Sequence, residues 1–430
     1  MKLSQFFLVI AILCSTNVLF AGDVYRFRGE NSQGKYNEPG LLDSWPEGGL
    51  TPKWINSELG EGWSSIIKVK DRLYIASVDT TDPKKESVVC LDLNGIILWQ
   101  QPVGAVWSGS SYPIPRATPA YVVGDTPADD RILALSGNGE LYCIAATDGK
   151  PIWNKDVAKL YETTMSRWGM AECVVVKDGL AFITVCGKKA LLVALRIADG
   201  SEVWKTEPLD DIVAYVSPAL CETSQGGRRL IAVTENFVSM IDVDQGRLQW
   251  SSNFQQDSGG KIERVEWSNC NPPLVKGNQF FVTQGYNQGG VMYEIHPDGQ
   301  SVEKRWTSKV LDAHHDGAVE VDGRIYGSNW LSNETGKWCC LEWETGNTIY
   351  DEPWANLGKG ITITADGKLF LYEEKRGTLA LAKPGDHFDV VGSFRMDYGT
   401  KEHWAHPVIS DGVLYVHRGN TLAAFDIGKK

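Results

Sequence analysis

One short motif recurs along this chain: a glycine turn followed, four residues later, by a large aromatic residue. The clearest copies are “TDGKPIW”, “ADGSEVW”, “DQGRLQW” and “ETGNTIY”, with a looser copy in “LNGIILW”. With weaker copies included, the repeated aromatic residues are Trp54, Trp99, Trp153, Trp204, Trp250, Trp306, Tyr350 and Phe394. Their spacing of 44 to 56 residues is typical of solenoids, propellers and other repeat arrays.

The content of each period favours a propeller. Two β-rich runs are joined by Asp-Gly or Gly-Asn, as in “CVVVKDGLAFITV” and “PLVKGNQFFVTQ”, which is a strong local signal for a β-hairpin. A third run such as “LLVALRI” and the short run that ends in the aromatic residue complete four strands. No long amphipathic helix separates them. The sequence therefore predicts an all-β fold, a propeller of four-stranded antiparallel blades.

The motif itself has a physical explanation. We expect the glycine to adopt a positive φ in the turn between the third and fourth strands, where a Cβ atom would clash. The aromatic side chain can then fill the wedge between neighbouring blades and bury a large surface. A ring of sheets needs such a filler once per blade, so the repetition predicts structure rather than chemistry.

The periods predict eight blades, from about residue 63, in a single domain that spans residues 22–430. The last period holds three strands, and residues 50–55, “LTPKWI”, are predicted to supply the fourth and close the ring. Seven blades remain an alternative, because the aromatic ends at Trp306 and Phe394 are weakly marked. Residues 22–49 are expected to form an irregular lead-in.

Residues 1–21 are predicted to be a cleaved secretory signal. Lys2 is followed by the apolar run “FFLVIAILC”, and “LFA” before Gly22 provides a small-residue cleavage site. The run is too short to span a bilayer as a transmembrane segment. Cys14 is not expected to be lipidated, because the bulky Leu13 precedes it. The sequence thus predicts a periplasmic or secreted protein.

Charge and cysteine content exclude several classes of function. A formal net charge of −12 argues against nucleic acid and anionic membranes as partners. An even number of cysteines follows the signal, which permits disulfides in an exported protein. However, Cys90, Cys143 and Cys340 occupy a repeat position that holds Ala194 and Ala424 elsewhere, so we expect them to be packed as small buried side chains. No C-x-x-C or C-x-x-C-H occurs, which argues against a zinc knuckle and a c-type haem.

These repeats resemble the quinoprotein-like propellers, the family with PQQ-type repeats, over about residues 40–430. The stretches “LLDSWPEGG”, “GEGWSS”, “HHDGAV” and “HWAHPV” are similar to those of its exported bacterial branch, often labelled alcohol-dehydrogenase-like. The resemblance implies an eight-bladed ring. It also implies either quinone-dependent alcohol oxidation or a non-catalytic role in outer-membrane assembly, because the motif specifies the fold more than the function.

Segments that lead into the innermost strands are expected to converge on one mouth of the ring. Four histidines fall in two of these segments: His314, His315, His403 and His406. The other candidates are Arg116, Trp168, Glu172, Asn271, Asp316, Lys359 and Trp404. Convergent polar and aromatic side chains suit a small polar ligand or a protein partner. The alternative is a solvated channel without a specific ligand.

The resemblance would assign these residues to a PQQ- and Ca²⁺-dependent alcohol dehydrogenase. Arg116 and Lys359 would anchor the carboxylates of the cofactor, and Trp168 or Trp404 would stack on it. Glu172 and Asn271 would be calcium ligands, and Asp316 or Glu172 would be the catalytic base. It also implies a disulfide between adjacent cysteines beneath the cofactor. Cys339 and Cys340 lie instead within a predicted third strand, which argues against that platform.

Two further interpretations stay open. The four histidines could supply nitrogen ligands to zinc, copper or iron, although His406 could equally be a hydrogen-bonded residue that fixes its loop. A propeller with an acidic surface could also bind proteins, like the propeller subunit of the outer-membrane barrel assembly machinery, or act as a carbohydrate-related binding protein.

Overall fold

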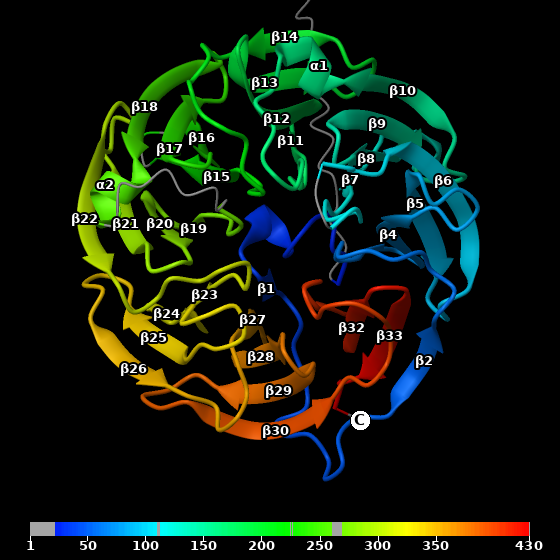
Figure 1. Cartoon of the computed structure of the whole chain (residues 1–430), viewed down its shortest axis with the longest axis vertical. Helices are drawn as coiled ribbons and strands as arrows, with labels where there is room; N and C mark the ends of the chain where they lie inside the picture. The colour runs from blue at the N-terminus through cyan, green and yellow to red at the C-terminus, as the bar shows by residue number, and fades with distance from the viewer. Residues whose placement is uncertain (1–21, 110–111, 224, 226, 260–268, 430) are drawn as a thin grey trace, which may run out of the picture.

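The chain forms a ring of β-sheets around a central axis (Figure 1). The structure, a computed structural model, describes residues 22–109, 112–223, 225, 227–259 and 269–429, so the predicted signal lies outside it. Within these residues, eight sheets each contain four consecutively hydrogen-bonded antiparallel strands. The prediction of an all-β, eight-bladed propeller is confirmed, and the seven-bladed alternative is excluded.

The blades follow one another along the chain. Blade one consists of β3 Ile67–Val69, β4 Arg72–Val78, β5 Lys85–Asp92 and β6 Ile97–Ala105, and blade two of β7 Ala120–Val122, β8 Arg131–Leu135, β9 Glu140–Ala145 and β10 Pro151–Asp156. Blade three consists of β11 Val175–Lys177, β12 Leu180–Gly187, β13 Ala190–Arg196 and β14 Glu202–Lys205, and blade four of β15 Ala219–Glu222, β16 Arg228–Val233, β17 Phe237–Asp242 and β18 Arg247–Asn253. Blade five consists of β19 Leu274–Lys276, β20 Gln279–Gln284, β21 Gly289–Ile295 and β22 Val302–Ser308, and blade six of β23 Val319–Val321, β24 Arg324–Ser328, β25 Trp338–Glu342 and β26 Thr348–Glu352. Blade seven consists of β27 Gly360–Ala365, β28 Lys368–Glu373, β29 Thr378–Lys383 and β30 Asp389–Arg395, and blade eight of β31 Val408–Ser410, β32 Val413–Arg418, β33 Thr421–Asp426 and β2 Pro52–Asn56.

Helices are few and short. They are η1 Glu30–Ser32, η2 Pro127–Asp129, α1 Val157–Tyr161 and α2 Phe254–Ser258. Over the described ranges, none has the length and apolar character that a membrane crossing requires.

An N-terminal strand closes the ring, as predicted. Strand β2 pairs antiparallel with β33 of the last blade, with Trp54 opposite Ala424 and Ile55 opposite Ala423. The strand covers residues 52–56, close to the predicted 50–55. Blade eight is therefore built from both ends of the chain, which leaves no unpaired edge at the junction.

The glycine–aromatic motif joins neighbouring blades. The Trp153 indole of β10 donates a hydrogen bond from Nε1 to the Ile197 carbonyl of the next blade at 2.7 Å. Gly200 in that turn has φ 71°, and a Cβ atom there would lie 2.9 Å from the Trp153 ring. Trp54, Trp99 and Trp306 make the same kind of hydrogen bond to the blade that follows. Each glycine thus receives the aromatic residue of the preceding blade.

Blade seven departs from this pattern, and the alignment of Phe394 with the repeated aromatic position was wrong. The equivalent position next to the β-bulge is Gly392, which pairs with Leu381. Trp45 of the lead-in packs there, with its ring centroid 5.2 Å from that of Phe394 and its backbone N 2.9 Å from a Cβ atom placed on Gly392. An aromatic side chain from outside the repeat fills this wedge, which explains the weak sequence signal.

The cysteines behave as packing residues. Cys90, Cys143 and Cys340 are each buried in an apolar cluster between strands. Cys339 and Cys340 are successive residues of β25 and pack into different clusters, one on each face of the blade. They are not joined to each other, in keeping with the argument against a disulfide platform.

The lead-in does more than its irregular sequence suggests. Residues 22–38, which we call the plug, cross the centre of the ring as the blue segment in Figure 1. Val24 pairs with Lys68 of β3, and Tyr121 of β7 donates its N–H to the Tyr25 carbonyl at 2.8 Å. Strand β1, Lys35–Tyr36, runs parallel to β27.

Two amide side chains of the plug substitute for strand backbone. Asn31 donates Nδ2–H to the Leu220 carbonyl at 2.8 Å and accepts the Leu220 N–H at 2.7 Å. Gln33 donates to the Pro273 carbonyl at 3.1 Å and accepts the Val275 N–H at 2.7 Å. Hydrogen bonds also join the plug to blades three, six and eight. The donors are the Phe27 N–H to Cys173 Sγ, the Arg28 guanidinium to the Ala318 carbonyl, and the Tyr36 hydroxyl to the Pro407 carbonyl.

The plug therefore contacts all eight blades. Its strand pairs with the end of β27 that precedes the turn at Asp366, because Tyr36 lies opposite Ala365. The segments singled out in the sequence precede the innermost strands and lie at the other end of the ring.

Candidate functional site

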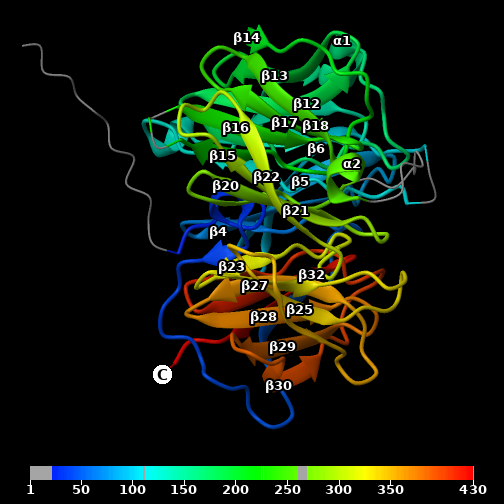
Figure 2. The same ribbon diagram turned by 90° about the vertical axis from the view of Figure 1, so that its left-hand side faces the viewer.

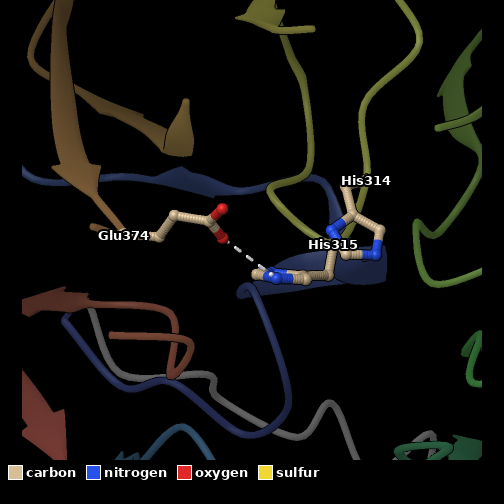
Figure 3. Close-up of side chains that lie close together, drawn as sticks. All are labelled: His314, His315 and Glu374. Atoms are coloured by element: carbon tan, nitrogen blue, oxygen red, sulfur yellow. Dashed lines mark ion pairs between the residues drawn. The ribbon is translucent and has the colours of Figure 1, made fainter. Parts of the chain in front are cut away.

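Loops of blades six and seven bring five ionisable side chains together at the end of the ring opposite β1. His314, His315 and Asp316 lie between β22 and β23, Lys359 directly precedes β27, and Glu374 follows β28. Figure 3 shows Glu374 pointing toward His315, with the His314 ring beside it. We call these five residues the mouth cluster.

Lys359 is the buried cation of the mouth cluster. Its ammonium group donates to Glu374 Oε1 and to His314 Nδ1 at 3.3 Å, and lies 3.8 Å from Asp316 Oδ2. The side chain is 0% exposed. Because an isolated charge is costly away from water, the pairing with Glu374 keeps this ammonium group in the interior.

His314 is held as a neutral imidazole. A lysine ammonium group can only donate, so Nδ1 accepts and the proton lies on Nε2, which donates to the Tyr286 hydroxyl at 2.6 Å. Burial, with the neighbouring His315 and Lys359, keeps the pKa of His314 well below its usual value. The ring is therefore uncharged and fixed in one tautomer.

His315 lies between two carboxyl groups. Its Nε2 is 3.1 Å from Glu374 Oε2, the dashed contact in Figure 3, and its Nδ1 is 3.7 Å from Asp316 Oδ1. The contact with Glu374 is an ion pair, and none of the four atoms has a well-aligned hydrogen-bond partner although all are buried. Such atoms are rare in folded proteins and mark a place where an additional partner would be accommodated.

The two carboxyl groups differ in acidity. Burial raises the pKa of Asp316 and the adjacent Glu374 raises it further, although Lys359 acts in the opposite sense. Burial acts on Glu374 in the same sense, but His315 and Lys359 outweigh it and hold the pKa of Glu374 below its ordinary value. Glu374 is therefore the stronger acid of the pair, and it forms the ion pair with Lys359.

Arg28 of the plug supports the mouth cluster from below. The guanidinium group donates to the Thr362 and Ala318 carbonyls and to His406 Nδ1, at 3.2, 2.7 and 2.8 Å. With Nδ1 accepting, His406 donates Nε2–H to the His315 carbonyl at 2.9 Å. Burial lowers the pKa of Arg28 to about 10. His406 thus fixes the backbone of His315 rather than facing a ligand.

Asn271 is likewise engaged by the backbone. Its amide donates to the Ala313 and His314 carbonyls, both at 2.8 Å, and its Oδ1 accepts the Gly317 N–H at 2.9 Å. These contacts shape the loop that presents the two histidines. The side chain positions the mouth cluster without extending into it.

Other predicted site residues lie further round the ring. Glu172 precedes β11 and accepts the Thr184 N–H at 3.0 and 3.3 Å, and burial raises its pKa to about 8. A hydrogen bond of 2.6 Å joins His403 Nδ1 and the Tyr372 hydroxyl, and burial lowers the pKa of His403 to about 4. Neither makes a hydrogen bond or ion pair with the mouth cluster among the described contacts, although the charge of Glu374 acts on His403.

An aromatic wall connects the cluster with Arg116. The ring centroid of Trp404 lies 5.1 Å from that of His315 and 4.7 Å from that of Trp63. The Arg116 guanidinium lies 5.2 Å from the Trp63 ring centroid and donates to the Trp168 carbonyl at 2.8 Å. Arg116 is therefore held by the wall, with its charge directed to backbone and ring faces.

Comparison with known proteins places the chain in a family. Residues 84–350 match the family described as outer membrane protein assembly factor BamB. The chain belongs to this family. Its PQQ-type repeats bear out the resemblance to the quinoprotein-like propellers.

Individual relatives are distant from this member of the family. Outer membrane protein assembly factor BamB of Yersinia pestis is 25% identical over 230 residues, which cover 53% of this chain and 52% of that protein. The chain therefore matches about half the length of this curated relative. BamB from Moraxella catarrhalis has a TM-score of 0.59 and 12% identity, covering 88% of this chain and 99% of that chain.

Dehydrogenases share the same ring. A europium-containing methanol dehydrogenase has a TM-score of 0.67 and 10% identity, covering 92% of this chain and 89% of that chain. The quinohemoprotein alcohol dehydrogenase of Comamonas testosteroni has a TM-score of 0.63 and 10% identity, covering 96% and 82%. At such identities these likenesses show the fold alone.

The two residues proposed as calcium ligands do not form a calcium site. The Asn271 oxygen is taken by the Gly317 N–H, and the Glu172 carboxyl, on blade three, accepts the Thr184 N–H. A calcium site needs several oxygen ligands on one ion, and these two residues are directed to separate backbone groups.

Sequence reasoning missed two members of this arrangement. Glu374 lies in the turn between β28 and β29, outside the segments that precede innermost strands, and Arg28 lies in the lead-in. Only the geometry of a propeller identifies Glu374, because loops that follow second strands share a face with loops that precede first strands. No periodic signal marks Arg28.

Proposed function

We propose that this chain is a binding protein whose ligand site is the mouth at His315, and that the ligand is small and polar. The observation that carries the proposal is the set of buried polar atoms of His315, Asp316 and Glu374 that make no hydrogen bond. His315 is 17% exposed while the two carboxyl side chains are 6% exposed or less, so a ligand reaches the set from the His315 edge. The adjacent face of Trp404 adds an apolar wall, a combination typical of small-molecule sites.

Thermal unfolding of the protein without residues 1–21 tests the proposal. The probes are glucose, galacturonate, succinate, and PQQ with and without Ca²⁺. A ligand at 100 times its Kd adds about 2.7 kcal/mol to the stability of the folded state. We expect at least one of the first three probes to raise the midpoint in the wild type and not in His315→Ala. The control is His387→Ala, since His387 has an 85% exposed side chain.

Two outcomes would overturn the proposal. An equal rise in His315→Ala would place the ligand elsewhere on the ring. A saturable rise that needs both PQQ and Ca²⁺ would restore the dehydrogenase interpretation. We also propose an extracytoplasmic location, following the predicted signal, which cell fractionation with a C-terminal tag would test.

A second candidate function is a scaffold of the outer-membrane assembly type. Large apolar side chains are exposed on the outer strands and turns of four adjacent blades: Ile55, Leu93, Ile96, Leu98, Ile152 and Val203. The positions equivalent to Leu98 hold Gln249, Arg305 and Lys53 in blades four, five and eight, and the partly buried Ile349 and Val391 in blades six and seven. At this position, exposed apolar side chains therefore lie on blades one to three. Side chains of this kind favour a protein partner.

The test of this candidate is a change on that side of the ring alone. The triple variant Leu98→Glu, Ile152→Glu, Val203→Glu should lose a component of the outer-membrane assembly machinery that the wild type retains in affinity purification from its own host. Retention by both proteins, or by neither, would count against the scaffold.

A further inference from the structure

We propose that His314, His315 and Glu374 form a site for a divalent transition metal ion at the mouth of the ring. This inference rests on the proposed function, because it assigns a ligand class to the same mouth. Two imidazoles and one carboxylate are the donor set of many zinc and non-haem iron centres that keep open positions for a further ligand.

The donor atoms already lie close together. One ligand atom from each of the three residues falls within 4.8 Å of the others. Ligand atoms around a bound zinc ion lie roughly 3.3 Å apart, given metal–ligand distances of about 2.0–2.1 Å. His315 Nε2 and Glu374 Oε2 are at 3.1 Å, so the adjustment falls mainly on His314. Small movements of side chains, not of strands, would complete the site.

Two of the three donor residues are held at their second polar atom by another group. His314 directs Nε2–H to the Tyr286 hydroxyl and Glu374 Oε1 is bound by Lys359, whereas His315 Nδ1 lies 3.7 Å from Asp316 Oδ1. This arrangement is the outer shell that metal-binding histidines and carboxylates have in proteins, where it fixes tautomer and orientation. The atoms left for the ion are His315 Nε2, His314 Nδ1 and Glu374 Oε2.

Lys359 is the strongest argument against the site. Its ammonium group lies 3.3 Å from His314 Nδ1 and would repel a dication. However, Glu374 Oε1 and Asp316 Oδ2 hold the ammonium group, and the Glu374 carboxylate offsets part of the added charge. The ion would displace the contact of Lys359 with His314 and take the place of the ion pair between His315 Nε2 and Glu374 Oε2.

The site is selective by chemistry. Nitrogen-rich donor sets suit zinc, cobalt and iron, whereas calcium prefers six to eight oxygen ligands. Calcium is therefore expected not to bind, which separates this site from a PQQ–calcium centre. The His315 side of the ion would face solvent and the Trp404 wall, leaving a coordination position for the small polar ligand.

Calorimetric titration of the chelator-treated full chain with Zn²⁺, and visible absorption with Co²⁺, test the inference. We expect one equivalent to bind and Ca²⁺ to give no heat. His315→Ala and Glu374→Gln should each weaken Zn²⁺ binding by at least about 100-fold, and Tyr286→Phe by about 10-fold. The matched control, His387→Ala, should bind as the wild type does, and circular dichroism of every variant checks the fold.

Absence of stoichiometric Zn²⁺ binding to the wild type would overturn the inference. So would unchanged binding in both His315→Ala and Glu374→Gln, which would indicate surface histidines. Failure of the metal test leaves the thermal-shift result of the proposed function unaltered, because glucose, galacturonate and succinate are titrated in the presence of chelator. The two proposals can therefore fail separately.

Discussion

At the scale of single residues, Glu172 gives the fold a pH dependence. Burial raises its pKa to about 8, above a value of about 4.3 in an unfolded chain. Between these values the folded protein keeps a proton that the unfolded chain has released. The stabilisation is therefore complete below about pH 4 and is lost as the pH rises toward 8.

Glu172→Gln should remove this dependence while still accepting the Thr184 N–H. Between about pH 5 and about pH 8, the free energy of unfolding of the wild type should fall by roughly 3–4 kcal/mol more than that of the variant. Urea unfolding at four pH values measures the difference, with the exposed Glu303→Gln as control. Parallel curves for wild type and Glu172→Gln would show that another group titrates.

The sequence predicted where the candidate site lies better than it predicted which side chains are available to a ligand there. The sequence identified the loops that meet at one mouth, and His314, His315, Asp316 and Lys359 do lie together there. It could not distinguish these from Asn271 or His406, whose polar atoms are bound to backbone groups from other blades. Whether a polar side chain has an atom left for a ligand depends on partners hundreds of residues away, such as Arg28.

At the scale of elements, alanine substitution of two glycines tests how tightly the wedge between blades is packed. Gly200 has φ 71° and would place a Cβ atom 2.9 Å from the Trp153 ring, whereas Gly367 has φ 67° and no atom within 4 Å. Alanine at either position incurs a left-handed backbone cost of about 1–2 kcal/mol. Gly200→Ala should cost about 1–3 kcal/mol more, because it also displaces Trp153.

Chemical denaturation of the two variants gives this difference directly. Equal destabilisation by Gly200→Ala and Gly367→Ala would mean that the Trp153 indole moves aside freely and that the wedge is loosely packed. A third variant, Trp153→Phe, removes the hydrogen bond to the Ile197 carbonyl and should cost about 1 kcal/mol.

Elements were predicted well wherever the repeat is regular. The period and the hairpin dipeptides predicted four strands per blade, eight blades and closure by residues near Trp54. The prediction failed at Phe394, where Gly392 holds the repeated position and Trp45 comes from outside the repeat. A sequence repeat indicates only interactions that recur in every blade, so it cannot predict a contact that occurs once and comes from a distant segment.

At the scale of the whole molecule, the plug is the segment that crosses the centre of the ring. It has no periodic pattern, yet it makes hydrogen bonds to every blade. Each blade nevertheless has its own paired strands, and apolar clusters of buried side chains surround the ring. These internal interactions greatly outnumber those with the plug. We therefore expect the ring to fold without residues 22–38 and the plug to act as a separable insert.

Native-state hydrogen exchange after deletion of residues 22–38 measures this separability. Five backbone amides of innermost strands donate to the plug: Lys68, Tyr121, Leu220, Val275 and Thr364. They should lose most of their protection in the deletion variant, because their acceptors are gone, while amides of the third strands, such as those of Met240 and Met292, keep theirs. Loss of protection in the third strands of all blades would instead show that the ring depends on the plug. In that case the contacts of Arg28 and Asn31 would be required for folding rather than for closing one end of a formed ring.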